Sequence, residues 1–410
     1  MTKNNFKHHH LPHGDNGDGV LNPHPTSFVP DKFWAQRKRL FSRYDMGIRI
    51  GGGIDDEDKD VSSEMWYSVT PESIANHIAK RIAHIILYQR KSQWMAEMTQ
   101  RAERDRNECV KREKVEGIPP ANNEAERSKP RHRKQNNIII LDLFCGCGGN
   151  SIAFARWNNK NTRKEDGEGC NEHQQLDCCP GPPPCIKVIA VDNNLSRLMN
   201  AAHNASIYEV PREDIIFVHA DAVEVLHQYS KGVRRVMRDD VGGCMNSFGK
   251  ARSLDEVSEK VCWLGFTLGG MELLPENIDG IFLSPPWGGM SYEKTTFDLV
   301  ASITVESSIL DETSQQVENN NTEDGGNTTV TTNGAELLSI AIKALFGDTA
   351  EQQEQGVLAY FLPRNVNGID IGHNALASSV VGCFEIEQNV VCGKVKTVTA
   401  YFGKGLNEML

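Results

Sequence analysis

From residue 137 onward the chain alternates short apolar runs with helical patterns, and this alternation narrows its possible folds more than any other feature. The runs are rich in Ile, Val and Phe and are bounded by polar turns, which is typical of buried strands. Strands separated by helices predict a parallel sheet covered on both faces. We predict strands within residues 137–144, 186–192, 214–221, 278–286 and 356–364, and helices over 150–157 and 195–205.

The end of the chain has a different pattern. Residues 384–391 and 395–403 are two β-rich runs separated by a Cys-Gly-Lys turn, which predicts an antiparallel hairpin. A mostly parallel, doubly wound α/β sheet that ends in such a hairpin resembles the Rossmann-like class I methyltransferases. We therefore expect that fold class, with a small helical extension at the N-terminal side.

The remaining residues divide by composition. Thr70 and Pro71 precede a row of isoleucines at helical spacing, so a helix should begin there with Thr70 as its N-cap. Polar stretches rich in Gly, Asn or Cys interrupt the strand pattern and are expected to be surface insertions. The predicted organisation is a disordered tail (1–30), an N-terminal helical extension (31–89), a charged helical or disordered linker (90–136), and a methyltransferase domain (137–410) with insertions near 158–185, 228–275 and 304–334.

Composition limits the setting and the partners. The chain has 410 residues and a net charge of -11, which disfavours broad nucleic-acid binding, but basic segments at 32–49 and 127–134 allow a local anionic ligand. No apolar run is long enough for a membrane span, and no export signal is seen, so we expect no membrane partner and a cytosolic or nuclear protein. The eleven cysteines should then be reduced.

The Cys-rich insertion does not predict a metal site. A zinc site needs four convergent ligands, and paired CxxC spacing is missing from this stretch. The cysteines and histidine concerned are Cys170, His173, Cys178, Cys179 and Cys185.

The segment 141–150, LDLFCGCGGN, joins the first predicted strand to its helix. Glycines such as Gly146 and Gly148 let the backbone turn tightly and approach a ligand, whose negative group can bind at the following helix N-terminus. The spacing differs from the dinucleotide motif GxGxxG. The turn predicts a cofactor site at the carboxyl edge of the sheet.

Three aspartates stand at the ends of three successive predicted strands. Asp142 suits a cationic group such as the amino group of a methionine moiety, Asp192 suits ribose hydroxyls, and Asp221 suits adenine. Each alone also reads as a loop cap or a solvated acid. Together at one sheet edge they favour S-adenosyl-L-methionine as the cofactor.

The fourth strand ends in Ser-Pro-Pro-Trp. A backbone carbonyl freed by the Pro285 geometry, helped by the Ser284 hydroxyl, can orient an exocyclic amine for in-line attack on a methyl group. Trp287 offers a face on which the ring of that amine can stack. A plain turn followed by a core tryptophan is the alternative reading of this segment.

Six segments in order resemble the trimethylguanosine synthase family, which hypermethylates 7-methylguanosine RNA caps. They read KFWAQRKRLFSRYDMGI, WYSVTPESIANHIA, LDLFCGCGGNSIAFA, LSPPWGG.SY, YFLPRN and EIEQN...GKVKTVTAYFG. The resemblance implies methylation of the cap guanine 2-amino group, first to 2,7-dimethyl and then to 2,2,7-trimethylguanosine. It also implies capped RNA of the small nuclear or nucleolar type as partner and a location in the nucleus, with the cytoplasm as a second place. The insertions are foreign to the compact family core, and we expect them to offer sites for protein partners. Nothing in the sequence resembles a dimer motif, so a monomer is expected.

The same resemblance implies further site residues. The cap triphosphate would be bound by Lys32, Tyr292 and Arg364, with Asn365 as another substrate contact. The cofactor would be bound by four further side chains, with the cofactor carboxylate at the first two: Ser68, Thr70, Asn150 and Asn204. Ser291 departs from the family pattern, in which an acidic residue is usual.

Two other functions remain open on the sequence alone. One is a guanine or adenine amino methyltransferase that acts on internal positions of tRNA or rRNA, which would need a broad basic surface. The other is a catalytically inactive cap-binding module, which the intact glycine turn argues against.

Overall fold

The computed structural model describes residues 20–26, 28–51, 59–116, 137–162, 184–231, 261–287, 296–308, 329–347, 355–377 and 383–406. Within these residues, a nine-stranded sheet has the order β10-β11-β9-β6-β1-β2-β3-β5-β4. Its strands are β1 (Ile138–Leu143), β2 (Ile186–Asp192), β3 (Ile215–His219), β4 (Val261–Trp263), β5 (Phe266–Gly269), β6 (Gly280–Leu283), β9 (Val357–Pro363), β10 (Phe384–Val391) and β11 (Lys394–Phe402).

The central strands pair in parallel, as the sequence predicted. β1 lies between β2 and β6, while β3 and β9 continue the parallel pairing outward. These strands are almost completely buried, because helices cover both of their faces. The predicted hairpin is also confirmed, since β10 pairs antiparallel with β11, and β11 pairs antiparallel with β9. The chain therefore has the Rossmann-like, doubly wound fold.

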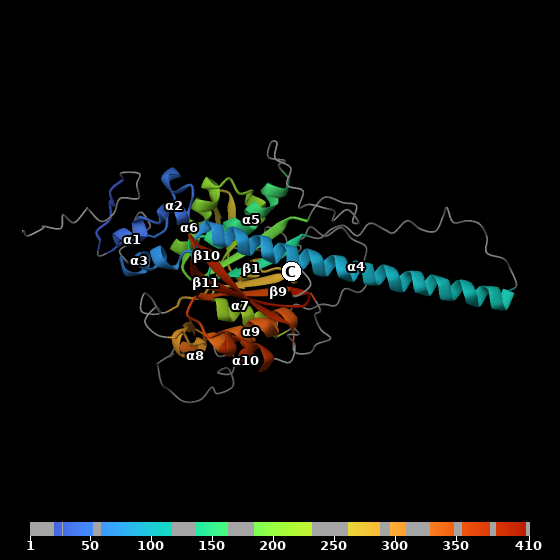
Figure 1. The fold of residues 1–410 in the computed structure, drawn as a ribbon. Helices are drawn as coiled ribbons and strands as arrows, with labels where there is room; N and C mark the ends of the chain where they lie inside the picture. The colour runs from blue at the N-terminus through green and yellow to red at the C-terminus, as the bar shows by residue number, and fades with distance from the viewer. Residues whose placement is uncertain are drawn as a thin grey trace, which may run out of the picture.

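Helices form a layer on each side of the sheet (Figure 1). One hydrophobic core joins α4 (Glu72–Glu116), α5 (Gly149–Thr162) and α6 (Leu195–Ile207) to one face. A second core joins α7 (Ala222–Ser230), α8 (Leu299–Ser302), α9 (Gly334–Phe346) and α10 (Gly368–Ala377) to the other. Short 3₁₀ turns complete the chain at η1 (Tyr44–Met46), η2 (Arg212–Asp214) and η3 (Met271–Leu273).

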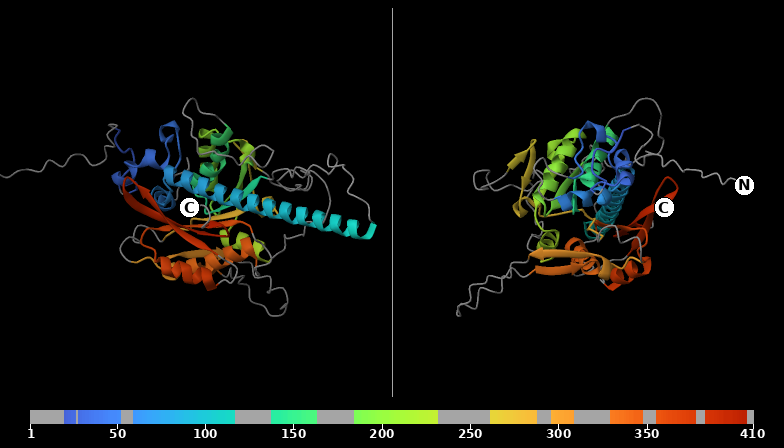
Figure 2. Two further views of the ribbon diagram at one scale, coloured as in Figure 1. Left: turned by 45° about the vertical axis from the view of Figure 1, so that its right-hand side comes forward. Right: turned by 90° about the vertical axis from the view of Figure 1, so that its left-hand side faces the viewer.

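Two of the predicted insertions contain regular structure, which corrects the sequence interpretation. In the stretch 228–275, β4 and β5 form a hairpin that adds to the edge of the main sheet beside β3. In the stretch 304–334, β7 (Thr304–Ser308) and β8 (Thr329–Asn333) form a separate two-stranded sheet. This ribbon lies on the α9 side of the main sheet (Figure 2). The ribbon strands, TVESS and TVTTN, were missed because Thr, Ser and Asn also suit loops.

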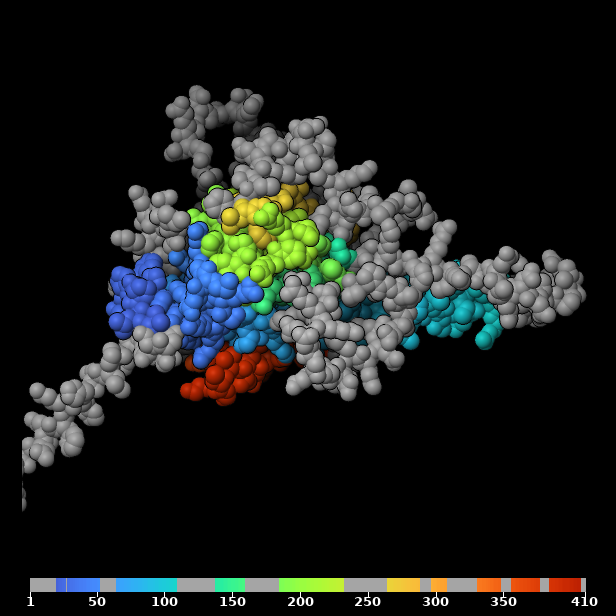
Figure 3. All heavy atoms as spheres, turned by 90° about the horizontal axis from the view of Figure 1, so that it is seen from above, coloured from blue at the N-terminus to red at the C-terminus, as the bar shows by residue number. Residues whose placement is uncertain are grey.

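The N-terminal extension packs against the body of the domain. It contains α1 (Asp31–Trp34), α2 (Arg37–Leu40) and α3 (Lys59–Ser68). Figure 3 shows this blue segment lying directly against the green region that contains α6. Part of the predicted disordered tail is also packed, because Val29 is fully buried and Val20 accepts a hydrogen bond from the Trp34 indole. Residues 1–19 lie outside the described residues.

Helix α4 is 45 residues long and has two different halves. Its first half buries the predicted isoleucine stripe, including Ile78 and Ile82, against the domain. Its second half includes residues 90–116, which were predicted to belong to the charged linker. These residues are almost entirely exposed through residue 108, and this half of the helix projects beyond the domain (Figure 1). Glu97 stands four residues before Arg101, a spacing that favours a solvated helix. Among the described helices, none is both long and apolar enough to cross a membrane.

Candidate active site

The candidate site lies where the strand order of the sheet reverses. β1 and β6 are neighbours, with Leu143 opposite Leu283, so the residues that follow each strand emerge side by side. The Ser284 hydroxyl donates a long hydrogen bond of 3.4 Å to the Phe144 carbonyl, which connects the two segments. Ligands bind at such a switch point in open α/β sheets. Here the structure has a cavity of about 380 Å³, within the range of small-molecule sites.

Many predicted residues from distant parts of the chain line this one cavity. They are Ser68, Thr70, Gly146, Asn150, Asp192, Asp221, Ser284, Pro285 and Trp287.

The glycine turn has the backbone geometry that the sequence predicted. Gly146 and Gly148 have positive φ angles of 54° and 89°, a region that disfavours other residues. A side chain at Gly148 would also place its Cβ 2.9 Å from the Ala201 Cβ, so the turn packs closely on α6. Phe144 shares the left-handed conformation, with a φ of 68°. The turn is therefore tightly constrained between β1 and α5.

Asp192 holds the turn in place. Its carboxylate accepts hydrogen bonds from the backbone N–H groups of Gly146, at 2.9 Å, and Asn194, at 3.0 Å. Burial raises the pKa of Asp192, and the Arg197 guanidinium, 3.9 Å away, opposes that shift. Asp192 thus supports the cavity wall and also lines it.

Asp221 is the N-cap of α7, in agreement with the sequence interpretation of this residue as a cap. Its Oδ1 atom accepts hydrogen bonds from the N–H groups of Val223 and Glu224 at the start of α7. The residue nevertheless lines the cavity. Capping and a ligand contact are therefore compatible at this position.

Asp142 is fully buried behind the cavity wall and does not line it. The Ser151 hydroxyl donates to its Oδ2 atom, while Oδ1 is buried and has no hydrogen-bond partner among the described residues. Burial raises the pKa of Asp142 to about 7, although the bond from Ser151 acts against this rise. A buried acceptor of this kind is stabilised by a nearby cation.

The N-terminal extension supplies the opposite wall of the cavity. Thr70, buried between α3 and α4, accepts a hydrogen bond from the Asn150 amide at 3.1 Å, and the Oδ1 atom of Asn150 is buried with no partner among the described residues. Ser68 is the last residue of α3, not the start of α4, and its exposed hydroxyl donates to the Glu64 carbonyl.

Asn204 is one of three predicted cofactor residues that do not line the cavity, with Asp142 and Gly148. Its amide is fully buried, exchanges hydrogen bonds with both backbone groups of Arg49, and donates to the Cys147 carbonyl. It therefore joins α6 to the extension and to the glycine turn. The prediction of direct cofactor contact is corrected to a positioning role.

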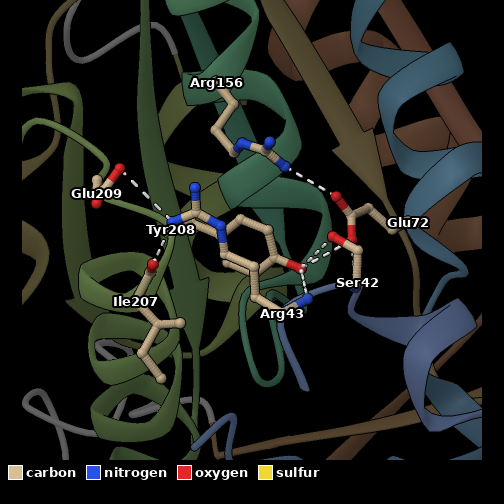
Figure 4. Close-up of polar contacts among 7 residues, drawn as sticks. All are labelled: Ser42, Arg43, Glu72, Arg156, Ile207, Tyr208 and Glu209. Carbon is tan, nitrogen blue, oxygen red and sulfur yellow. Dashed lines mark hydrogen bonds and ion pairs between the residues drawn. The ribbon is translucent and has the colours of Figure 1, made fainter. Parts of the chain in front are cut away.

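A polar cluster fixes the extension near this junction (Figure 4). Glu72 accepts hydrogen bonds from the Ser42 backbone, the Tyr208 hydroxyl and Arg156, at 2.6, 2.8 and 2.9 Å. Burial alone would raise the pKa of Glu72, but these bonds outweigh it and hold the pKa below its ordinary value. Arg43 adds a bond to the Ile207 carbonyl at 2.6 Å.

The aromatic wall of the cavity contains Trp287 and Phe361. The Trp287 indole is half-buried, and its ring centroid lies 5.4 Å from that of Phe361 at an angle of 34°. The indole packs against both hydrophobic cores, yet it shares the cavity with the glycine turn. One face of an otherwise fixed ring can therefore meet a ligand.

Two of the predicted triphosphate residues, Lys32 and Arg364, lie outside the cavity lining. Lys32 is exposed, with its Nζ atom 4.7 Å from the Phe33 ring, and Phe33 contacts Tyr67 of the cavity wall at 5.8 Å. Arg364 is exposed just after β9. The backbone carbonyl of the neighbouring Asn365 accepts a hydrogen bond from Phe297. Tyr292 and Ser291 lie outside the described residues.

Several cavity residues were not foreseen from the sequence. Arg197 lies between the acids Asp192 and Glu64, with its guanidinium 3.5 Å from Glu64. It stands on the first turn of α6, five residues after the strand-ending Asp192, a place that could have drawn attention to it. The other unforeseen residues are Glu64, Met65, Tyr67, Val69, Asn193, Ala222, Thr304, Val305, Glu306 and Phe361.

The cysteines of the glycine turn are buried and are not disulfide-bonded. Burial raises the pKa of the Cys145 thiol well above its ordinary value and that of Cys147 to about 12, so both remain neutral packing groups. No group of His, Cys, Asp or Glu that could hold a metal ion is found in the described part of the chain. Of the four cysteines and the histidine of the Cys-rich insertion, only Cys185 is among the residues described.

The cavity fits S-adenosylmethionine in its chemistry. A constrained glycine turn lies next to Asp192, and the Oδ1 atom of Asn150, which lines the cavity, has no protein donor among the described residues. Asp142 lies behind the cavity wall, where its carboxylate can act on a cationic group through its charge. An amino group and ribose hydroxyls are donors of the kind that buried acceptors require. Thr70 and Asn150 would contact the methionine end, and Asp192 the ribose.

A comparison with known proteins also identifies a methyltransferase as a relative of this chain. Trimethylguanosine synthase of Schizosaccharomyces pombe is 23% identical over 278 residues, which cover 67% of this chain and 61% of that protein. This chain thus spans less than two thirds of the relative.

Solved structures align less closely. The S-adenosylmethionine-dependent methyltransferase from Agrobacterium tumefaciens has a TM-score of 0.31 at 8% identity, over 66% of this chain and 56% of that one. An rRNA methylase from Streptococcus thermophilus has a TM-score of 0.26 at 10% identity, over 65% and 87%. The fold assignment therefore rests on the strand order of the sheet.

A family model covers the sheet from β2 to β11. It describes RNA cap guanine-N2 methyltransferases and matches residues 185–405, which is more than half of the chain. This chain therefore belongs to the RNA cap guanine-N2 methyltransferase family, enzymes that take their methyl group from S-adenosylmethionine.

Proposed function

We propose that this protein methylates the exocyclic 2-amino group of a 7-methylguanosine RNA cap, giving 2,7-dimethyl and then 2,2,7-trimethylguanosine. The observation that carries the proposal is that the Trp287 indole and the Gly146 turn line one cavity. A ring on the indole and a cofactor on the turn would then lie close enough to react. Family membership supports the same reaction.

Stacking on Trp287 would select the cap base. Guanine methylated at N7 carries a positive charge, and a cation over an indole gains about 0.5–2 kcal/mol. Phe361 supports the indole from within the wall, so little side-chain freedom is lost when the base binds. Neutral guanine would lack the charge-dependent part of this attraction.

Ser284 and Pro285 would orient the amine. A hydroxyl has one donor and two acceptor sites, and the Ser284 donor is directed to the Phe144 carbonyl. Its lone pairs therefore remain available to accept an N–H of the 2-amino group, as does the backbone carbonyl preceding the prolines. Bound S-adenosylmethionine supplies an electrophilic sulfonium methyl. Ser284 and that carbonyl would hold the amino nitrogen in line with the methyl carbon, so that the S–C bond breaks as the N–C bond forms and S-adenosylhomocysteine is the leaving group. The cationic ring would help the nitrogen lose its proton to solvent.

The remaining substrate contacts follow from the family resemblance. Lys32 and Arg364 carry exposed positive charges, and we propose that they bind the cap triphosphate together with Tyr292. Lys32 is joined to the cavity wall through the Phe33 and Tyr67 rings. Asn365 would assist Arg364.

The decisive assay combines the full chain with S-adenosylmethionine and either a 7-methylguanosine cap analogue or GTP, and follows methyl addition by mass spectrometry. We expect one and then two methyl additions to the cap analogue and none to GTP. Methylation of GTP alone, or of internal tRNA or rRNA positions alone, would defeat the cap proposal. Cap binding without methyl transfer would identify an inactive cap-binding module.

A matched pair of tryptophan variants tests the stacking step. Trp287→Ala should lower kcat/KM for the cap analogue on the order of 10²-fold, because the base is no longer held in line. Its affinity for S-adenosylmethionine should be retained. Trp94→Ala, on the projecting half of α4, removes an indole outside the cavity and should change neither. Loss of cofactor affinity in Trp287→Ala would instead assign Trp287 a folding role.

We also propose a nuclear monomer that acts on small nuclear or nucleolar capped RNAs and binds protein partners through its insertions. The family resemblance supports the nuclear location and the class of RNA, whereas the monomer is proposed because no dimer motif is seen in the sequence. Imaging of the tagged full chain should show nuclear signal, and solution scattering should give a monomer mass. Exclusively cytoplasmic signal or a stable dimer would contradict it.

A further inference from the structure

The β7–β8 ribbon contributes a wall to the cavity. Thr304, Val305 and Glu306 of β7 all line it. Along this strand, Val305 and Ser307 are buried, whereas Thr304 and Glu306 are exposed. This period of two places the Glu306 carboxylate on the solvent-facing side of the ribbon, at the open part of the cavity.

Four carboxylates line the cavity, and three of them are engaged. Asp192 accepts two backbone hydrogen bonds, and Asp221 caps α7. Glu64 lies 3.5 Å from Arg197. Within the described residues, the Glu306 carboxylate makes no hydrogen bond or ion pair, so its charge is available to a bound molecule.

The charge balance of the cavity favours a cationic ligand. Among the side chains that line it, four carry negative charge and only Arg197 carries positive charge. Arg197 already lies near Asp192 and Glu64, which offset its charge. An additional carboxylate at the open end would attract a cation and repel an anion.

We propose that Glu306 is a specificity-determining residue that selects the positively charged, N7-methylated guanine over neutral guanine. This inference rests on the proposed function and assigns the selectivity of that site to a second element besides Trp287. The carboxylate attracts the delocalised positive charge of the methylated ring, which neutral guanine lacks. Its exposed position suits an entering substrate rather than a cofactor held at the buried glycine turn.

Equilibrium binding tests the proposal separately from turnover. Quenching of tryptophan fluorescence by 7-methylguanosine triphosphate and by GTP gives the ratio of the two dissociation constants. Glu306→Gln should weaken binding of the methylated nucleotide about tenfold, the scale of one charge-assisted contact, and leave GTP binding nearly unchanged. Higher salt should reduce the ratio in the native protein more than in the variant.

Two controls complete the experiment. Glu276→Gln makes the same charge change at an exposed residue outside the cavity and should keep the native ratio. Calorimetry should show unchanged S-adenosylmethionine affinity in Glu306→Gln, and its thermal unfolding midpoint should match the native one. A variant that keeps the native ratio, or that loses cofactor affinity instead, overturns the proposal.

The two proposals can fail separately. A native protein that methylates the cap analogue but shows the same discrimination after Glu306→Gln retains the proposed function and refutes the role of Glu306. A native protein that neither binds nor methylates the cap analogue refutes both.

Discussion

The Tyr208 hydroxyl donates a 2.8 Å hydrogen bond to the Glu72 carboxylate and so joins the end of α6 to the start of α4. The same carboxylate binds Ser42 of the N-terminal extension and Arg156 of α5. Four segments that are distant in sequence therefore meet at one acid (Figure 4). Because the extension forms one wall of the cavity, this acid connects stability with the geometry of the site.

Removing the charge of Glu72 should destabilise the protein. Glu72→Gln weakens three hydrogen bonds, one of them to Arg156, and should lower the free energy of unfolding by about 1–3 kcal/mol. Denaturant titration measures the change. Glu209→Gln is the matched control, because Glu209 is largely exposed and contacts Arg43 at 3.6 Å, so its pair is worth about 1 kcal/mol or less. Equal losses in the two variants would contradict a central role for Glu72.

Glu72 should also contribute to the acid sensitivity of the protein. The pKa of Glu72 is held below its unfolded value of 4.5, so its stabilisation is present above pH 4.5 and is lost as pH falls through the folded pKa. In Glu72→Gln this contribution is missing throughout. We therefore expect the stability difference between native and variant proteins to shrink below pH 4.5 in denaturant titrations. A constant difference across that range would refute the linkage.

Gly148 should tolerate a methyl group less well than another left-handed glycine. Gly148→Ala combines a φ of 89° with a Cβ only 2.9 Å from the Ala201 Cβ. Gly393→Ala, in the β10–β11 turn, has a φ of 71° but nothing within 4 Å. Each variant should lose about 1–2 kcal/mol to strain, and Gly148→Ala about 1–3 kcal/mol more to overpacking. Thermal unfolding checks the difference, and similar midpoints would contradict it.

Asp142 should make cofactor binding depend on pH. Its folded pKa of about 7 exceeds the unfolded 3.8, so the stability it contributes without ligand is present below 3.8 and is lost as pH rises through about 7. A cationic amino group stabilises the ionised form. S-adenosylmethionine affinity, measured by calorimetry, should therefore rise between about pH 6 and 7.5, where an α-amino group is still mostly protonated.

The Asp142→Asn variant removes that titration. Its affinity should be lower by about tenfold or more and nearly independent of pH. Asp214→Asn is the control, because Asp214 is also a buried acid but pairs with Lys187 outside the cavity. A pH dependence that persists in Asp142→Asn would exclude Asp142 as its source.

The sequence predicted the parts of the fold that depend on strong local patterns. β1, β2, β6 and β9 are continuous apolar runs, and the left-handed turn at Gly146 and Gly148 needs glycine. Both patterns can be recognised from the order of residues alone, without knowledge of tertiary contacts. The ribbon strand β7 was missed, because its sequence TVESS has a polar face that also suits a loop.

The candidate site was predicted where residues follow strand ends and missed where tertiary packing decides. Trp287 and Asp192 were identified because they stand at strand ends. Asn204 was misassigned, since only packing shows that its amide binds the Arg49 backbone. The sequence around Glu306 does not indicate a site residue, because the place of Glu306 in the cavity depends on how the ribbon folds back onto the domain.

Helix α4 gives the molecule an asymmetric outline. At 1.5 Å per residue its 45 residues extend about 68 Å, whereas a compact domain of this chain length has a radius of gyration of only about 22 Å. Rotational diffusion should therefore be anisotropic, with slow end-over-end tumbling and faster spinning about the helix axis. A fluorophore attached near residue 108 would report the slow motion, and one on the exposed Leu376 of α10 would follow the body of the domain.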